Sequence, residues 1–304
     1  MGVIMQRNRY LVYDDLLMRI VRPKWFSIPC QNAGIAVLRT MARSARSVME
    51  VMFPPCCLAC GGEVASDAVS LCRDCAQRVE RERREPACPR CASSVAPHEV
   101  SNGRCAACRR RRLRVVNTIR VGSYAGRDAD GDLDGPAISC VGRLLRAYKY
   151  AGREEIEPLL GGWLADAVRR ASWMTQVEAI ASVPTHWKRR FLRPLHAAER
   201  LAAVVSRETG VPHVPLLRRV RAGPRQVDLG YADRVRNVRG AFAVRRNIIL
   251  EQTRLLLIDD VKTTGATLNE CAKTLRRAGA SEVYAAVLVT AAWSSDRSTA
   301  RNVI

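Results

Sequence analysis

The chain has 304 residues, of which 48% are hydrophobic and 26% are charged, and its formal net charge is +21. These proportions are typical of a globular protein with a sizeable core, and the length fits one large or two modest domains. No run of 18 or more apolar residues occurs, so no membrane-spanning helix is expected. The opening MGVIMQRNRY has charges and no long apolar stretch after them, so no secretory signal is predicted.

The charge excess is the most unusual property of the composition. Fifty Lys and Arg residues stand against 29 Asp and Glu residues. Such an excess favours an anionic partner, with nucleic acid first and phosphorylated metabolites second. The alternative explanation is a GC-rich genome, which raises the arginine content of every protein it encodes.

The first 52 residues are predicted to be an N-terminal extension. Residues 1–30 show little pattern, whereas residues 33–53 have the pattern of a basic amphipathic helix. Such a helix can bind a membrane surface, but its modest apolar face favours packing onto the next domain. We therefore expect weak membrane association if any, and a cytoplasmic protein.

Eight of the twelve cysteines form four C-x-x-C pairs within a short segment. Two such pairs supply the four thiolates of a tetrahedral zinc site, so the spacing predicts two structural zinc ions. Disulfides are one alternative, but no secretory signal supports an oxidising compartment. A thioredoxin-like redox motif is another, but no βαβ pattern surrounds these cysteine pairs. The predicted ligands are Cys57, Cys60, Cys72, Cys75, Cys88, Cys91, Cys105 and Cys108.

Three further residues outside these pairs have predicted roles. Cys56 adjoins Cys57 and can replace it as a ligand, and His98 is a minor candidate ligand. Cys271 lies at helical spacing in the C-terminal part and is predicted to be buried.

A dense arginine run follows the last cysteine pair, in the stretch CRRRRLR. It is either a patch that contacts nucleic-acid phosphates or a solvated linker to the next domain. Part of its positive charge offsets the negative charge of the zinc-bound thiolates. The candidate nucleic-acid residues are Arg109, Arg110, Arg111, Arg112 and Arg114.

From about residue 116 the pattern changes to alternating strands and helices. This alternation predicts an α/β fold, with a parallel sheet flanked by helices. The expected strands are 117–126, 177–184, 254–260 and 282–293, and the expected helices are 139–153, 157–171, 196–210 and 267–280.

The stretch LLLIDDVKTTGATL, residues 255–268, predicts a ligand site at the carboxyl end of a strand. We expect a strand over 255–258, acids at its end, a loop over 261–266, and a helix from Thr267. The N–H groups at the start of a helix bind phosphate, and hydroxyls in the loop add donors. Asp259 and Asp260 suit ribose hydroxyls and Mg²⁺. The alternative is an ordinary strand-to-helix turn with an Asp cap.

At these residues the chain closely resembles the PRPP (phosphoribosyl pyrophosphate) motif of type I phosphoribosyltransferases. Over residues 53–293 it resembles the ComF (ComFC-like) family of competence-associated proteins. The segments that carry this resemblance, in order, are FPPCCLACG, LLRAYKYAGR, SVPTHWKRRFLRPLHAAERLA, QVDLGYADRVRNVRGAF and LLLIDDVKTTGATL. The resemblance implies a small double zinc-ribbon domain at 53–115 before a type I phosphoribosyltransferase-like domain at 116–304.

The resemblance also assigns roles to residues. It implies PRPP binding by Asp259, Asp260, Val261, Lys262, Thr263, Thr264, Gly265, Ala266 and Thr267. The candidates for a pyrophosphate or other basic role are Lys149, Thr185, His186, Lys188 and Arg193. Three more residues lie in family signature segments, namely Gln226, Arg234 and Asn237. One departure is RPLHAA, residues 193–198, where the family pattern is RGFNQA.

The favoured function is a ComF-like protein that binds PRPP or a similar ribose-phosphate ligand and assists single-stranded DNA handling in natural transformation. DNA-uptake motor or recombination proteins are the expected protein partners, and Mg²⁺ is expected with PRPP. The alternatives are an active Mg-dependent phosphoribosyltransferase of unknown acceptor substrate, or a PRPP-sensing regulator. No P-loop occurs, so the chain is not expected to be a motor.

Overall fold

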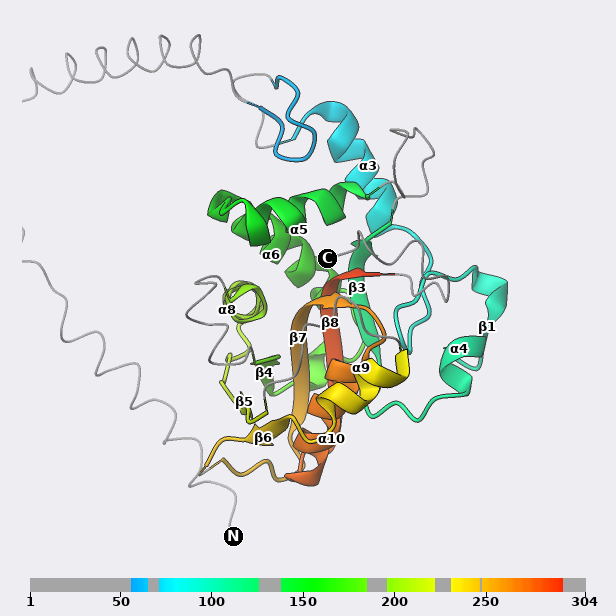
Figure 1. Cartoon of the computed structure of the whole chain (residues 1–304), viewed down its shortest axis with the longest axis vertical. Coiled ribbons are helices and arrows are strands. Elements are labelled where there is room, and N and C mark those ends of the chain that lie inside the picture. The colour runs from blue at the N-terminus through cyan, green and yellow to red at the C-terminus, as the bar shows by residue number, and fades with distance from the viewer. Residues whose placement is uncertain are drawn as a thin grey trace, which may run out of the picture. The chain divides into compact units, whose positions relative to one another are not determined.

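The computed structural model describes residues 56–64, 71–125, 138–184, 196–221, 231–246 and 248–291 (Figure 1). The chain divides into two compact units, Met1–Pro54 and Pro55–Ile304, and every described residue belongs to the second. The predicted helix over residues 33–53 lies outside the described residues.

A parallel sheet of four strands forms the centre of the described part. Its strands, in the order β3-β8-β7-β4, are β3 (Thr118–Ser123), β8 (Glu282–Thr290), β7 (Arg254–Lys262) and β4 (Ala179–Ser182). Leu257 of β7 pairs with Ala285 of β8 on one side and with Ala181 of β4 on the other. The expected parallel sheet is therefore confirmed.

Helices cover both faces of this sheet (Figure 1). Leu256 and Ile258 of β7 point into a core with three helices, α5 (Cys140–Tyr150), α6 (Glu157–Arg169) and α8 (Ala197–Thr209). The intervening Leu255 and Leu257 point into a second core with α10 (Ala266–Arg277). This alternation follows from the two-residue period of a strand. The second face is covered by α9 (Tyr231–Val238), α10 (Ala266–Arg277) and the antiparallel pair β5 (Leu217–Arg219) and β6 (Phe242–Val244).

Local signals in the sequence explain where the helices begin and end. Ser139 precedes α5, and its Oγ accepts a hydrogen bond of 2.9 Å from the Gly142 N–H. Gly210 ends α8 with φ 74°, a left-handed conformation that favours glycine. The expected helices therefore form within a few residues of their predicted limits.

The cysteine-rich segment forms small elements ahead of the sheet. They are α3 (Arg73–Arg83), the two-residue strands β1 (Val100–Ser101) and β2 (Arg104–Cys105), and α4 (Ala106–Arg109). A short 3-10 helix, η1 (Pro97–Glu99), also belongs to this segment. Two more 3-10 helices lie further along the chain, η2 (Glu154–Ile156) before α6 and η3 (Met174–Gln176) before β4.

Two side chains fix this segment to the sheet. Glu82 of α3 caps α5 because its two carboxylate oxygens accept hydrogen bonds from the Cys140 N–H (2.7 Å) and the Val141 N–H (3.0 Å). The buried Arg120 of β3 donates to Thr290 Oγ1 (2.7 Å) and to Glu85 Oε2 (3.3 Å). The described residues on either side of the predicted boundary at 115/116 thus form one compact unit, and that boundary stays a prediction.

None of the helices within the described ranges is both long and apolar enough to cross a bilayer.

Candidate functional site

The eight predicted metal ligands gather into two tetrads. The first tetrad is Cys57, Cys60, Cys72 and Cys75, and the second is Cys88, Cys91, Cys105 and Cys108. Within each tetrad all four sulfurs lie within 4.8 Å of one another. Among the described residues, Cys56 and His98 belong to neither tetrad. The predicted pairing of successive C-x-x-C motifs is therefore confirmed.

The spacing of the sulfurs fits zinc. The distance from Cys60 Sγ to Cys72 Sγ is 3.8 Å, and in the second tetrad Cys88 Sγ lies 3.7 Å from Cys108 Sγ. A regular tetrahedron with Zn–S bonds of about 2.3 Å has edges of about 3.8 Å. The Cys105 N–H also donates to Cys88 Sγ (3.3 Å), a contact that stabilises a thiolate. With all four positions taken by sulfur, such a zinc ion would be structural and not catalytic.

Within residues 255–268, the end of the strand and the start of the helix both differ from the prediction. Strand β7 does not end at Ile258 but continues to Lys262, and helix α10 begins at Ala266 instead of Thr267. The strand continues because its backbone pairs with β8 as far as Lys262 opposite Thr290, whatever the side chains are. Both carboxylates thus lie within the strand, and the loop shortens to residues 263–265, here called the β7–α10 loop.

Gly265 allows this loop to be so short. Its φ is 76°, and a Cβ built on it would lie 3.2 Å from Lys262 Cε. The Thr264 hydroxyl oxygen accepts a hydrogen bond of 3.3 Å from the Ala266 N–H at the start of α10. A glycine is required here because of both the left-handed backbone and the close lysine side chain.

The carboxylate pair is in contact with a cation from another element. Lys149 Nζ of α5 lies 2.8 Å from Asp260 Oδ2, and the two side chains are 20% and 18% exposed. Burial lowers the pKa of Lys149, but the Asp260 carboxylate outweighs it, so the pKa is raised. Burial, followed by the neighbouring Asp260 charge, raises the pKa of Asp259 well above its ordinary value. Lys149, a basic candidate from the sequence, thus lies in contact with Asp260.

The topology places these groups where parallel sheets bind ligands. The chain leaves β4 towards α8 on one face, and it leaves β7 towards α10 on the other. Adjacent strands whose connections diverge in this way leave a crevice at their carboxyl ends. The predicted basic candidates Thr185, His186, Lys188 and Arg193, and the signature residue Gln226, lie outside the described residues. Arg234 and Asn237 lie on α9.

The arginine run, residues 109–114, lies beside α10. The Arg114 N–H donates to Asn269 Oδ1 of α10 (2.6 Å). Arg90 of the second tetrad's first knuckle donates to the carbonyls of Leu113 (3.1 Å) and Val116 (2.6 Å). The run is therefore not a loose linker at its C-terminal end, although its five arginine side chains are exposed.

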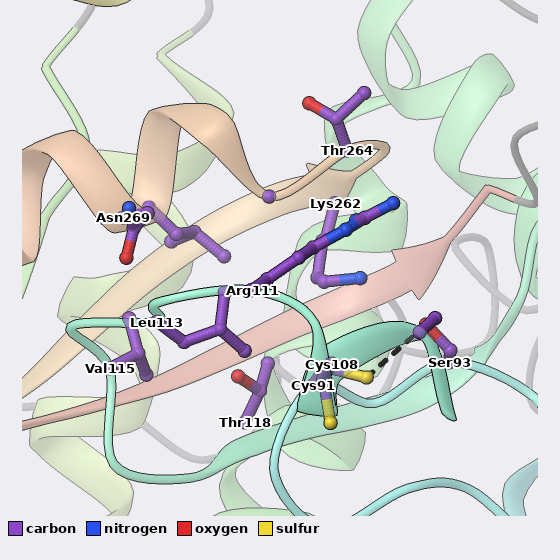
Figure 2. A pocket seen from close by; sticks show the side chains of 13 residues that line it. Cys91, Ser93, Cys108, Arg111, Leu113, Val115, Thr118, Lys262, Thr264 and Asn269 are labelled. Atoms are coloured by element: carbon purple, nitrogen blue, oxygen red, sulfur yellow. Dashed lines mark hydrogen bonds between the residues drawn. The ribbon is translucent and has the colours of Figure 1, made fainter. Parts of the chain in front are cut away.

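A pocket lies between the second tetrad, the arginine run and the β7–α10 loop (Figure 2). Its polar lining residues include Ser93, Arg111, Thr118, Lys262, Thr264 and Asn269. Sequence reasoning missed this grouping because no spacing signal links residues so far apart along the chain.

Fold and site together define a class of protein, in which a double zinc ribbon precedes a parallel α/β domain with two adjacent acids near the end of a central strand. The double zinc ribbon model matches residues 48–109, which include all eight tetrad cysteines. The predicted fold class, a parallel sheet flanked by helices and preceded by a double zinc ribbon, is thus confirmed.

Named relatives extend along most of the chain. It is 28% identical to Competence protein F of Haemophilus influenzae over 233 residues, 75% of this chain and 93% of the relative. It is also 28% identical to the DNA utilization protein YhgH of Salmonella typhimurium over 234 residues, 76% of this chain and 94% of the relative. The chain is a homologue of these proteins, and the resemblance to the ComF family is confirmed.

Solved phosphoribosyltransferase structures are also similar to the chain. The glutamine PRPP amidotransferase of B. subtilis is 21% identical, with a TM-score of 0.33, over 47% of this chain and 30% of its own. The purine phosphoribosyltransferase of Pyrococcus horikoshii is 17% identical, with a TM-score of 0.30, over 46% of this chain and 76% of its own.

Proposed function

We propose that the protein binds PRPP or a similar ribose-phosphate ligand at the β7–α10 loop and assists the handling of single-stranded DNA in natural transformation. Its relatives are named for competence and for DNA utilization, which supports the second half of the proposal. Protein partners in this role would be DNA-uptake motor or recombination proteins of the cytoplasm.

One observation carries the ligand assignment. Two adjacent carboxylates, Asp259 and Asp260, lie near the carboxyl end of β7, and a short loop after this strand leads into a twelve-residue helix, where β7 adjoins β4. The N–H groups at the start of α10 suit a phosphate, and the carboxylates suit hydroxyl donors. A molecule with a phosphate at one end and a vicinal diol at the other satisfies both, and ribose 5-phosphate is such a molecule.

The same carboxylates fit a magnesium ion, because Mg²⁺ prefers oxygen ligands from one or two carboxylates together with substrate phosphates. Asp259 and Asp260 would be its protein ligands. The ion would supply positive charge next to the ligand's pyrophosphate. Lys149 would share Asp260 with the ion or move towards the ligand.

Titration calorimetry with PRPP and Mg²⁺ tests the ligand assignment. Asp260→Asn removes one hydroxyl acceptor, and we expect it to weaken binding by about tenfold, equivalent to one charge-assisted hydrogen bond. Asp166→Asn changes a half-exposed acid on α6; it is the matched control and should bind like the wild type. Absence of PRPP binding by the wild type, or equal binding by Asp260→Asn, would contradict the proposal.

The DNA half of the proposal rests on the arginine run and the net charge of +21. We expect a triple variant, Arg109→Ala/Arg110→Ala/Arg112→Ala, to bind a single-stranded oligonucleotide more weakly and with a shallower salt dependence, since each lost phosphate contact reduces the slope by about 0.7. The control changes two other exposed arginines, Arg276→Ala/Arg277→Ala of α10. Fluorescence anisotropy at several salt concentrations gives both slopes, and equal slopes for the two variants would refute this role.

A second candidate is an active phosphoribosyltransferase, and the position of Lys149 favours it. This part-buried cation lies at the ligand carboxylates, where it suits the charge of a departing pyrophosphate. Incubation with labelled PRPP, Mg²⁺ and a panel of bases tests for turnover. Pyrophosphate release that falls at least about a hundredfold in Lys149→Met would support it; release equal in wild type and variant would exclude that role.

A further inference from the structure

A chain of polar contacts joins three helices that pack on one face of the sheet (Figure 1). Tyr148 of α5 is fully buried, and its hydroxyl donates a hydrogen bond of 2.7 Å to Glu157 Oε2 of α6. The same carboxylate oxygen forms an ion pair with Arg200 of α8. Arg200 also pairs with Glu154 of η2, at 2.7 Å between Nη1 and Oε2. These four residues are here called the Tyr148 network.

Close packing of α6 on α8 brings the network together. A Cβ built on Gly161 of α6 would lie 2.5 Å from Val204 Cγ1 of α8, so the two helices touch at this glycine. Glu157 stands one helical turn before Gly161, and Arg200 stands one turn before Val204. Residues four apart lie on the same face of a helix. The contact one turn earlier therefore joins Glu157 to Arg200.

The network reaches α5 one residue before Lys149, in the last turn of the helix. Successive residues of a helix point about 100° apart. Tyr148 thus meets Glu157, while Lys149 Nζ lies 2.8 Å from Asp260 Oδ2. The last turn of a helix frays readily because its final carbonyl groups have no partner within the helix. The hydrogen bond from Tyr148 holds this turn from its side.

The tyrosine hydroxyl makes the network more than a group of surface ion pairs. Exposed ion pairs contribute little, whereas a buried hydroxyl that loses its acceptor carries a desolvation cost. Burial, followed by the hydrogen bond to Glu157, raises the pKa of Tyr148. The hydroxyl therefore keeps its proton across the neutral range and remains a donor.

We propose that the Tyr148 network positions Lys149 at the candidate ligand site, with Tyr148 and Arg200 as positioning residues that act through the lysine. The inference rests on the proposed function, because the site of a phosphate ligand gives the position of this cation its importance. A lysine side chain has many rotamers, and a fixed last turn reduces the space that its ammonium group explores. The network thus makes α8 part of the support that holds the cation at Asp260.

Acylation footprinting measures the position of Lys149 without any ligand. Zinc-loaded full-length protein reacts with an N-hydroxysuccinimide ester, and mass spectrometry gives the rate at each lysine. We expect Tyr148→Phe and Arg200→Met to accelerate the reaction of Lys149 about fivefold, the equivalent of one net hydrogen bond. Lys273 pairs with Glu270 on α10 and is the internal control, which should react at its wild-type rate.

Arg169→Met is the matched control for Arg200→Met. Arg169 also joins α6 to α8, through Glu208 (3.7 Å), but at the other end of both helices, and its side chain is 46% exposed against 38% for Arg200. It should leave the rate at Lys149 unchanged, and Arg200→Lys should stay closer to the wild type than Arg200→Met. Equal acceleration by Arg169→Met and Arg200→Met would overturn the positioning role, as would an unchanged rate in Tyr148→Phe and Arg200→Met.

Titration of PRPP with Mg²⁺ connects the network to the ligand. Tyr148→Phe should weaken binding about threefold in the wild-type background. In the Lys149→Met background it should have no effect, because a residue that acts only through Lys149 then has nothing to position. A loss of equal size in both backgrounds would mean that Tyr148 supports the fold and not the lysine, which would refute the inference.

Failure of the ribose-phosphate proposal gives a different result. If the wild type binds no PRPP, the proposed function is wrong. Faster acylation of Lys149 in Tyr148→Phe and Arg200→Met, with Arg169→Met unchanged, would still show that the network positions this lysine.

Discussion

The two cysteine tetrads have nearly the same local spacing but different surroundings. Cys60 of the first tetrad is exposed, and this tetrad packs through the apolar side of α3 into the core behind α5. All four sulfurs of the second tetrad are buried, and it lies against the β7–α10 loop, next to the buried Arg120. The first tetrad therefore supports the helix that carries Lys149, and the second supports the loop that opens α10.

The largest effect should come from removing a ligand of each tetrad. Cys108→Ser and Cys60→Ser should each reduce zinc content from two ions per chain to one. A structural zinc ion supplies on the order of 10 kcal/mol of folding free energy. We expect Cys108→Ser to lose more of this stability than Cys60→Ser, because Cys108 is surrounded by other buried thiols and a loop. In Cys60→Ser the apolar contacts between α3 and the core remain, so this variant should lose less stability. Metal analysis and thermal unfolding measure both effects.

The affinity for PRPP provides a second comparison of the two tetrads. Cys108→Ser should weaken PRPP binding strongly, whereas Cys60→Ser should leave it nearly unchanged at a temperature where both variants are folded. Equal weakening in the two variants would show that the tetrads do not differ in the way proposed.

The next effect concerns the buried cation beside the second tetrad. Arg120→Met leaves Glu85 without its buried partner, and we expect a loss of about 3–5 kcal/mol in the free energy of unfolding. Arg84→Met provides a surface control, since the ion pair between Arg84 and Glu80 is exposed and its loss should cost less than about 1 kcal/mol. Urea unfolding of both variants measures the difference; similar losses would mean that Arg120 does not hold the segment to the sheet.

A smaller effect is expected at the loop glycine. Gly265→Ala should cost about 1–2 kcal/mol from the left-handed backbone, and more from the contact with Lys262 Cε. Gly210→Ala is the matched control, because its φ is 74° and a Cβ there would meet no atom within 4 Å. Both should lower the melting temperature, but only Gly265→Ala should weaken ligand binding. Equal binding by the two variants would contradict a role for the loop.

The smallest effect concerns the cap beneath the first tetrad. Glu82→Gln keeps one acceptor for the start of α5 and should cost about 1 kcal/mol. Burial raises the pKa of Glu82, so its contribution to stability is largest at low pH and decreases as the pH rises through its folded pKa. The stability difference between wild type and Glu82→Gln should therefore shrink with rising pH, as denaturant unfolding across pH 4–8 would show. A difference that grows with pH would contradict this account.

Much of this architecture was predictable from local signals. The C-x-x-C spacing gave both tetrads, because two residues between thiolates allow one metal to bind both sulfurs. The apolar run Leu255–Ile258 gave the central strand, since a strand buried on both faces needs continuous hydrophobic residues. The limits of that strand were wrong because pairing with β8, a long-range contact, extends it to Lys262.

The sequence by itself determined the two cysteine tetrads, the alternation of strands and helices, and the acidic stretch before a short loop. Each depends on residues close together along the chain, whose spacing limits their geometry. Only the tertiary structure decided that Lys149 pairs with Asp260, that Glu82 caps α5, and that Arg111 and Lys262 share a pocket. These contacts join distant segments, and their partners are selected by how the helices and the cysteine-rich segment pack on the sheet.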